Sequence, residues 1–197
     1  VIARNAAEAS VHPKSHWNMH KDWNDSIPEL RDLRPAEEVR LILVEQLHPP
    51  HSWFVAPVPP ELLYVLMAMR QETDYAPHHL QKGVAFFGAM RLFAQQRAGS
   101  GFRAFYLTLD DARTRQSLTD NLDWIRSEVN ATKVSWQMPD EYRLDQQLTE
   151  WSARNRTEGL EVEAFDSEHF YTTRSELALF FEGKKTYRLE NFYRAMR

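Results

Sequence analysis

Two carboxylates and an amide stand where two apolar runs of the sequence end. Glu45 and Gln46 follow the run at residues 39–44, and Glu72 follows a second run at residues 61–69. A pair of carboxylates can act as acid and base. It can equally accept hydrogen bonds from the N–H of a heterocycle or from a chain of hydroxyls. The spacing alone leaves both chemistries open.

Histidines form two further candidate groups. His78 and His79 precede a predicted long helix, and Lys82 lies one turn into it, where amide dipoles favour an anion. A capping or surface role explains the histidine pair equally well. His16 and His20 have the i, i+4 spacing of metal ligands, but no third ligand accompanies them, which favours solvated histidines over a metal site.

Several motifs are missing from the sequence. There is no GxGxxG after a predicted strand, no P-loop and no GxSxG elbow, and the pair Gly99 and Gly101 falls between a helix and a strand, the wrong order for holding a pyrophosphate. The chain has no cysteine, which excludes disulfides, thiolate metal sites, iron–sulfur clusters and a cysteine nucleophile within it.

The composition is that of an ordinary globular protein. Of 197 residues, 43% are hydrophobic and 26% are charged, and 24 basic against 28 acidic residues give a net charge of -4. No apolar run approaches the ~20 residues of a membrane span, and no secretory signal is visible, so we expect a cytoplasmic protein without a membrane partner. The C-terminal stretch from Arg174 is basic, which favours a solvated helical face over a polyanion site.

Hydrophobic periodicity predicts alternating strands and helices. Strands are expected at residues 39–44, 61–69, 102–109, 133–136 and 160–165. Helices are expected at residues 77–99, with Gly83, Phe86 and Phe87 on the buried face, at 118–129, and after an N-cap at Asp140. This order predicts an α/β fold: a Rossmann-like, doubly wound, five-stranded parallel sheet flanked by helices.

Ligands of such sheets bind beyond the carboxyl ends of the strands, where the strand order reverses. The polar and turn residues that follow the predicted strands are therefore the candidate site: Glu45, Gln46, Glu72, Asp110, Asp111, Pro139 and Glu141.

The chain divides into three predicted parts. Residues 1–34 are polar and are expected to form an arm outside the core, residues 35–173 form the α/β domain, and residues 174–197 form a helical connector. The connector carries an apolar helix face at Leu189, Phe192, Tyr193 and Met196 that suits docking on further protein.

Several stretches in combination resemble a known family. They are LILVEQL, LMAMRQETDYAPHHLQK, GVAFFGAMRLFA, FRAFYLTLDD, WQMPDEYRLDQQL and FFEGKKTYRLENFYRAMR. Together they resemble the N-terminal part of the deoxyribodipyrimidine photolyase-related proteins, the prokaryotic iron–sulfur cryptochromes and (6-4) photolyases. The resemblance covers residues 39–197.

The resemblance implies an antenna domain that binds the small-molecule chromophore 6,7-dimethyl-8-ribityllumazine. In the family, FAD and a 4Fe-4S cluster belong to a helical half that this chain lacks. This helical half would be the protein partner of the antenna domain, and only the parent protein would contact DNA. Light-driven DNA repair or blue-light signalling is then the task of the parent. No catalytic residue and no metal ligand is expected in this chain.

The family pattern carries over by position, with departures. Val44-Glu45-Gln46-Leu47 stands where the family usually has Gly-Asp-Gln-Leu, and Ala68 replaces an acidic position. Glu72 matches a glutamate that contacts the antenna ring, and Phe86 takes the place of an aliphatic residue lining the pocket. The chromophore-binding residues that the resemblance implies are Val44, Glu45, Gln46, Glu72, Tyr75, His79 and Phe86.

A second interpretation is a stand-alone nucleotide- or flavin-binding α/β module, or an interaction domain whose pocket has closed, without photochemistry. Val44, Ala68 and Phe86 favour it, because they change the size and chemistry of the pocket. The apolar connector helix favours the antenna domain instead.

Overall fold

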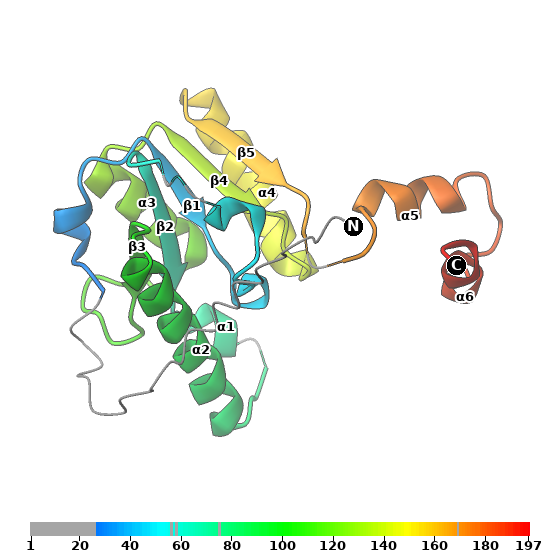
Figure 1. Cartoon of the computed structure of the whole chain (residues 1–197), viewed down its shortest axis with the longest axis horizontal. Coiled ribbons are helices and arrows are strands. Elements are labelled where there is room, and N and C mark those ends of the chain that lie inside the picture. The colour runs from blue at the N-terminus through cyan, green and yellow to red at the C-terminus, as the bar shows by residue number, and fades with distance from the viewer. Residues whose placement is uncertain (1–26, 56, 58, 75, 169) are drawn as a thin grey trace, which may run out of the picture.

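The computed structural model describes residues 27–55, 57, 59–74, 76–168 and 170–197. Five parallel strands form one sheet in the order β3-β2-β1-β4-β5 (Figure 1). The strands are β1 (Glu38–Leu41), β2 (Leu62–Met67), β3 (Ala104–Leu107), β4 (Lys133–Gln137) and β5 (Glu161–Phe165). The predicted Rossmann-like α/β fold is confirmed.

Helices cover both faces of the sheet. The described α-helices are α1 (Gln71–Asp74), α2 (Leu80–Gly99), α3 (Leu118–Val129), α4 (Tyr142–Thr157), α5 (Arg174–Phe181) and α6 (Leu189–Ala195), of which α2, α3 and α4 pack on the sheet. The short 3-10 helices are η1 (Leu30–Leu33), η2 (Val44–Gln46) and η3 (Ser52–Phe54). One core forms between the sheet and α3 and α4, and a second, rich in aromatic residues, forms between the sheet and α2. The chain runs outward from β1 to β3 and then returns to place β4 beside β1, so the strand order reverses between β1 and β4.

Two predicted helix features differ from the structure. Of α2, Met90, Phe93 and Ala94 are buried, whereas Phe86 is 37% exposed, because the first half of this helix extends past the sheet edge. The N-cap of α4 is Glu141 and not Asp140, and no side chain caps this end. Asp140 lies instead beside the guanidinium of Arg174, at 3.7 Å, which explains why it does not cap.

The end of the predicted N-terminal arm belongs to the core. Leu30 and Leu33 are 2% and 5% exposed and pack in the larger cluster. Their i, i+3 spacing puts both on one face of the 3-10 helix η1. The Arg103 guanidinium donates to the carbonyls of Leu33 and Pro35 and fixes this segment to β3. Leu30 and Leu33 thus pack with the α/β core, although the sequence predicts that residues 1–34 lie outside it. His16 and His20 lie outside the described residues.

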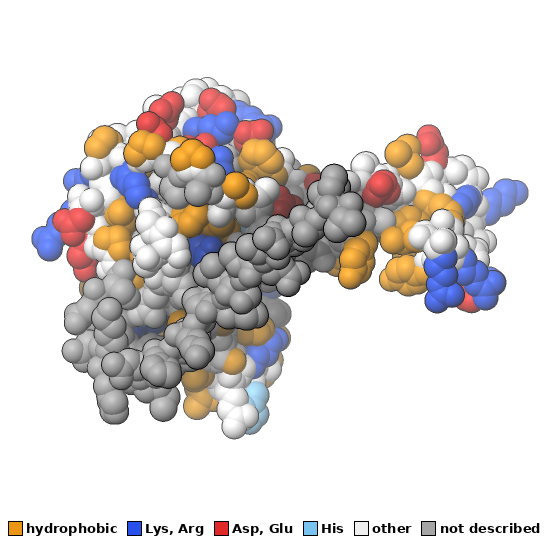
Figure 2. Space-filling view, in the orientation of Figure 1, with side chains coloured by type: hydrophobic (Ala, Val, Ile, Leu, Met, Phe, Trp, Pro, Cys, Tyr) orange, Lys and Arg blue, Asp and Glu red, His pale blue; other side chains and the backbone are white. Residues whose placement is uncertain are grey.

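The helices α5 and α6 stand apart from the sheet (Figure 1). Rings of Phe180, Phe181 and Phe192 pack edge to face between them, with Phe180 and Phe192 centroids 5.2 Å apart. Apolar and basic side chains share the surface of the connector, residues 174–197, in Figure 2. In the described part of the chain, no helix is long and apolar enough to cross a membrane.

Candidate functional site

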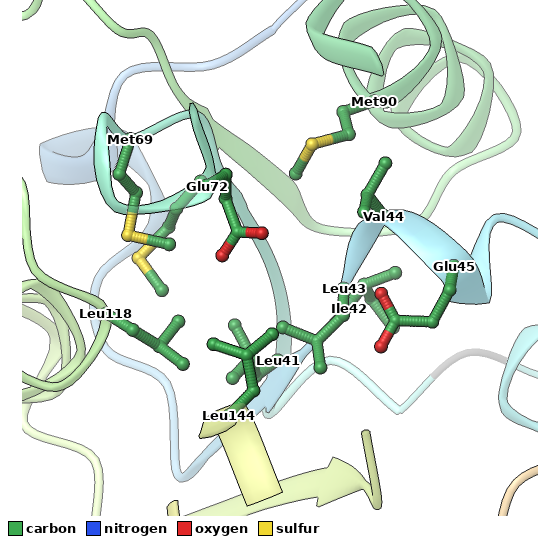
Figure 3. Close-up of a pocket in the computed structure, with 11 residues that line it drawn as sticks. Leu41, Ile42, Leu43, Val44, Glu45, Met69, Glu72, Met90, Leu118 and Leu144 are labelled. Carbon is green, nitrogen blue, oxygen red and sulfur yellow. The ribbon is translucent and has the colours of Figure 1, made fainter. Parts of the chain in front are cut away.

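A crevice lies at the carboxyl ends of β1 and β2, next to the reversal of strand order. The carboxylates of Glu45 and Glu72 approach it from η2 and from α1 (Figure 3). Apolar side chains make up the rest of its described wall: Leu41, Ile42, Leu43, Val44, Met67, Met69, Met90, Leu118 and Leu144. Two acids thus share one apolar space, as their positions after adjacent parallel strands predict.

Gln46 holds the turn that presents Val44 and Glu45. Its side chain is 2% exposed; Oε1 accepts from the Leu43 backbone N–H at 3.0 Å, and Nε2 donates to the Gln137 carbonyl at 3.1 Å. The amide therefore joins the end of β1 to the end of β4. Gln46 positions the crevice from behind and does not line it.

Gln71 holds the short helix that presents Glu72 to the crevice. Its Oε1 accepts from the Leu118 backbone N–H at 2.9 Å, and its Nε2 donates to the Gln147 side chain. These bonds tie the single-turn helix α1 to α3 and α4. Glu72, the next residue, is thereby directed into the crevice although α1 has no buried residue of its own.

The shared space changes the acidity of Glu72. Burial, followed by the negative charges of Glu45 and Glu141, raises the pKa of Glu72 from 4.5 to about 7, and the positive charge of Arg143 offsets part of this. At neutral pH Glu72 is thus divided between a protonated form that donates a hydrogen bond and an ionised form that accepts. Such a group suits proton transfer as well as recognition of a heterocycle.

The crevice is narrow. Its volume is about 10 Å³, which is what one water molecule needs and far below the ~300 Å³ at which ligand pockets begin. Three methionines, Met67, Met69 and Met90, line it. Their unbranched side chains can adopt other rotamers, so they are the part of the wall that can yield.

The structure brings together Val44, Glu45 and Glu72 of the predicted site residues. His79 lines a separate cavity beside α2, as does Asp110, and Phe86 lines neither. Tyr75 lies outside the described residues. Asp111 instead forms an ion pair with Arg113 at 2.6 Å, which holds the pKa of Asp111 below its usual range.

Neither the methionine wall nor Gln71 was predicted from the sequence, and Gln46 was predicted as a binding residue and not as a positioning one. Met67 and Met69 are two residues apart at the end of a strand, so a period of two places them on one face. That signal was present in the sequence. The long-range partners of Gln46 and Gln71 left no local signal, because Gln137 and Leu118 are far away along the chain.

Fold and crevice together define the protein as a doubly wound parallel α/β domain with an acidic crevice at its switch point. The model of the deoxyribodipyrimidine photo-lyase-related protein family matches residues 40–197, and the chain belongs to this family. It is similar to a (6-4) photolyase of Agrobacterium fabrum, with 27% identity over 157 residues. The match covers 80% of this chain and 30% of that relative, so the chain spans less than a third of the relative's length.

Proposed function

We propose that this chain is the antenna-chromophore domain of a light-dependent flavoprotein, and that the crevice between Glu45 and Glu72 receives the chromophore. The candidate chromophore is 6,7-dimethyl-8-ribityllumazine, which the family resemblance implies. The observation that carries the proposal is the pair of carboxylates in one apolar space, one of them with a pKa raised to about 7. A protonated Glu72 donates to a ring carbonyl, and a carboxyl oxygen of Glu45 accepts from a ring N–H or a ribityl hydroxyl.

The ring does not fit the crevice in the conformation described, because the volume is about 10 Å³. Binding therefore requires side chains to move. Met69 and Met90 stand on two sides of the space, and rotation of their side chains opens it without moving a strand (Figure 3). Val44 is stiff because it is β-branched, so it sets the width that remains.

The small volume of the crevice favours a second candidate function. With a volume of about 10 Å³, the domain would bind no chromophore and would serve as an α/β interaction module or nucleotide-binding module without photochemistry. The departures at Val44 and Ala68 from the family pattern agree with this alternative.

The remaining parts of the proposed activity would belong to a longer protein of which this chain would be one domain. FAD, the 4Fe-4S cluster, DNA contacts, and DNA repair or blue-light signalling would all require the helical half. This chain would bind and orient a chromophore and carry out no bond chemistry itself.

A fluorescence titration of the chain with 6,7-dimethyl-8-ribityllumazine tests the proposal. We expect saturable binding that is weakened at least tenfold by Val44→Trp, which fills the crevice. Val55→Trp is the matched control, because Val55 is 66% exposed and lies outside the crevice. Absence of saturable binding by the unsubstituted chain at millimolar chromophore would favour the closed module, and equal binding by Val44→Trp would place the chromophore elsewhere.

A further inference from the structure

A second and larger cavity lies beside the first half of α2 and the carboxyl end of β3. Its volume is about 580 Å³, within the ~300–1,000 Å³ range of small-molecule sites. No described residue lines both this cavity and the crevice. It is therefore a separate space, formed by the helix end that extends past the sheet.

Two glycines of α2, Gly83 and Gly88, line the cavity. Glycine lowers the stability of a helix interior relative to alanine, so its presence calls for a reason. Packing against the described atoms does not supply one: a Cβ at Gly88 would meet none within 4 Å, and a Cβ at Gly83 would meet only Thr73 Cγ2 at 4.0 Å. The glycines leave bare helix backbone facing the cavity, which lets a flat ligand approach closely.

Much of the cavity wall is apolar and exposed. Leu80 is 79% exposed, Val84 is 65% exposed and Leu109 is 37% exposed, and all three line the cavity together with Phe87. Large apolar side chains gathered in one exposed hollow mark a binding surface. With the phenyl ring of Phe87 and the glycine backbone beside them, they suit the face of a planar heteroaromatic ring.

Polar groups also line the cavity, at the β3 end and at the start of α2. Thr108, Asp110 and Arg91 are at the β3 end, where Tyr106 is already engaged, because its hydroxyl donates to the Phe87 carbonyl at 3.0 Å. The Asp110 carboxylate can accept two N–H donors from one edge of a ring.

Two histidines, His78 and His79, lie at the opposite end, before the helix begins. His79 Nδ1 accepts from the Gln81 backbone N–H at 3.3 Å, so a neutral His79 carries its proton on Nε2 and is a donor. From residue 79 to residue 91 the helix rises about 18 Å at 1.5 Å per residue. Side chains from both ends extend into this span, so a ligand that contacts both ends must be elongated.

We propose that this cavity binds a guanine nucleotide, with the N–H edge of the base on Asp110, the ring against Phe87 and Gly88, and the phosphate beside His78 and His79. Guanine offers two adjacent N–H donors to a carboxylate, whereas adenine offers an N–H only from its single amino group. The site therefore favours guanine over adenine. The inference stands on the second cavity and does not depend on chromophore binding in the crevice.

Calorimetric titration of the 197-residue chain with GMP tests the inference. Gly88→Leu places a bulky side chain in the cavity, at the face proposed for the ring, and introduces a good helix former. Gly99→Leu is the matched control, because Gly99 ends the same helix outside the cavity, and a Cβ at Gly99 would meet no described atom within 4 Å. We expect saturable GMP binding by the unsubstituted chain and by Gly99→Leu, and binding at least tenfold weaker by Gly88→Leu.

Comparison of ligands tests the orientation. GMP should bind at least tenfold more tightly than AMP, and Asp110→Asn, an exposed substitution that should not disturb folding, should reduce that preference. Inorganic phosphate alone should not displace GMP at equal concentration, and the ribityl-lumazine should not compete. Absence of GMP binding at millimolar concentration, equal binding by Gly88→Leu, or full competition by the lumazine would each overturn the assignment.

Discussion

The raised pKa of Glu72 makes the stability of the domain depend on pH in a way that one substitution removes. Below pH 4.5 Glu72 is protonated in both the folded and the unfolded chain, so burial carries no electrostatic penalty. Between pH 4.5 and about 7 the unfolded chain releases this proton while the folded protein keeps it, so the free energy of unfolding falls as pH rises. Above pH 7 both forms are ionised and the penalty is constant.

The size of the effect follows from the same two values. A pKa raised from 4.5 to about 7 corresponds to about 3 kcal/mol at ~1.4 kcal/mol per tenfold change in proton affinity. Glu72→Gln keeps the shape and removes the charge. The variant should therefore match the unsubstituted chain near pH 4.5 and exceed its free energy of unfolding by up to about 3 kcal/mol at pH 8.

Urea unfolding at pH 4.5, 5.5, 6.5 and 8, followed by circular dichroism, measures this difference. Glu150→Gln is the control, because Glu150 is exposed on α4 and outside the crevice, and it should leave the pH dependence unchanged. Glu45→Gln removes one of the two negative charges that raise the pKa and should move the transition to lower pH. If Glu72→Gln follows the unsubstituted chain at every pH, the shared acidic space is not as described.

Three further predictions concern the elements that hold the site. Gln46→Leu removes hydrogen bonds to Leu43 and Gln137 and should lower the free energy of unfolding, measured in urea, by about 2 kcal/mol. The control Gln96→Leu, on the exposed side of α2, should change it by under ~0.5 kcal/mol. Equal losses in the two variants would contradict the positioning role of Gln46. Trp151→Ala removes a side chain that is 1% exposed and leaves a cavity, so it should lower the free energy of unfolding by about 3–5 kcal/mol in the same assay. A loss below ~1 kcal/mol would contradict the described core. Arg174→Ala removes hydrogen bonds to the Met138 and Pro139 carbonyls, so amide hydrogen exchange in α5 should accelerate about tenfold with little change in β4. Unchanged exchange in α5 would show that Arg174 does not anchor this helix.

The sheet was predictable because each strand carries its own local signal. All six residues of β2 are buried, and a short run that is apolar throughout is typical of a strand covered on both faces. The placement of Glu45 and Glu72 in one crevice followed from the same reasoning, since parallel strands end at one edge.

The features that the sequence did not predict depend on contacts between segments that are distant along the chain. The burial of η1 rests on the packing of Leu30 and Leu33 in the core, with residues that follow much later in the sequence. Periodicity alone placed Phe86 on a buried face, but the sheet ends before it can cover the first half of α2. The width of the crevice was also beyond the sequence, because it depends on the rotamers of methionine side chains from β2, from the loop after it and from α2.

The location of bound chromophore tests the central proposal most directly. Amide chemical shifts of the ¹⁵N-labelled chain, recorded by NMR with and without 6,7-dimethyl-8-ribityllumazine, report where the ring lies. We expect the largest changes at residues 42–46 and 69–74, on the two sides of the crevice. Changes confined to residues 78–91 and 106–110, or no saturable change at all, would contradict the proposal.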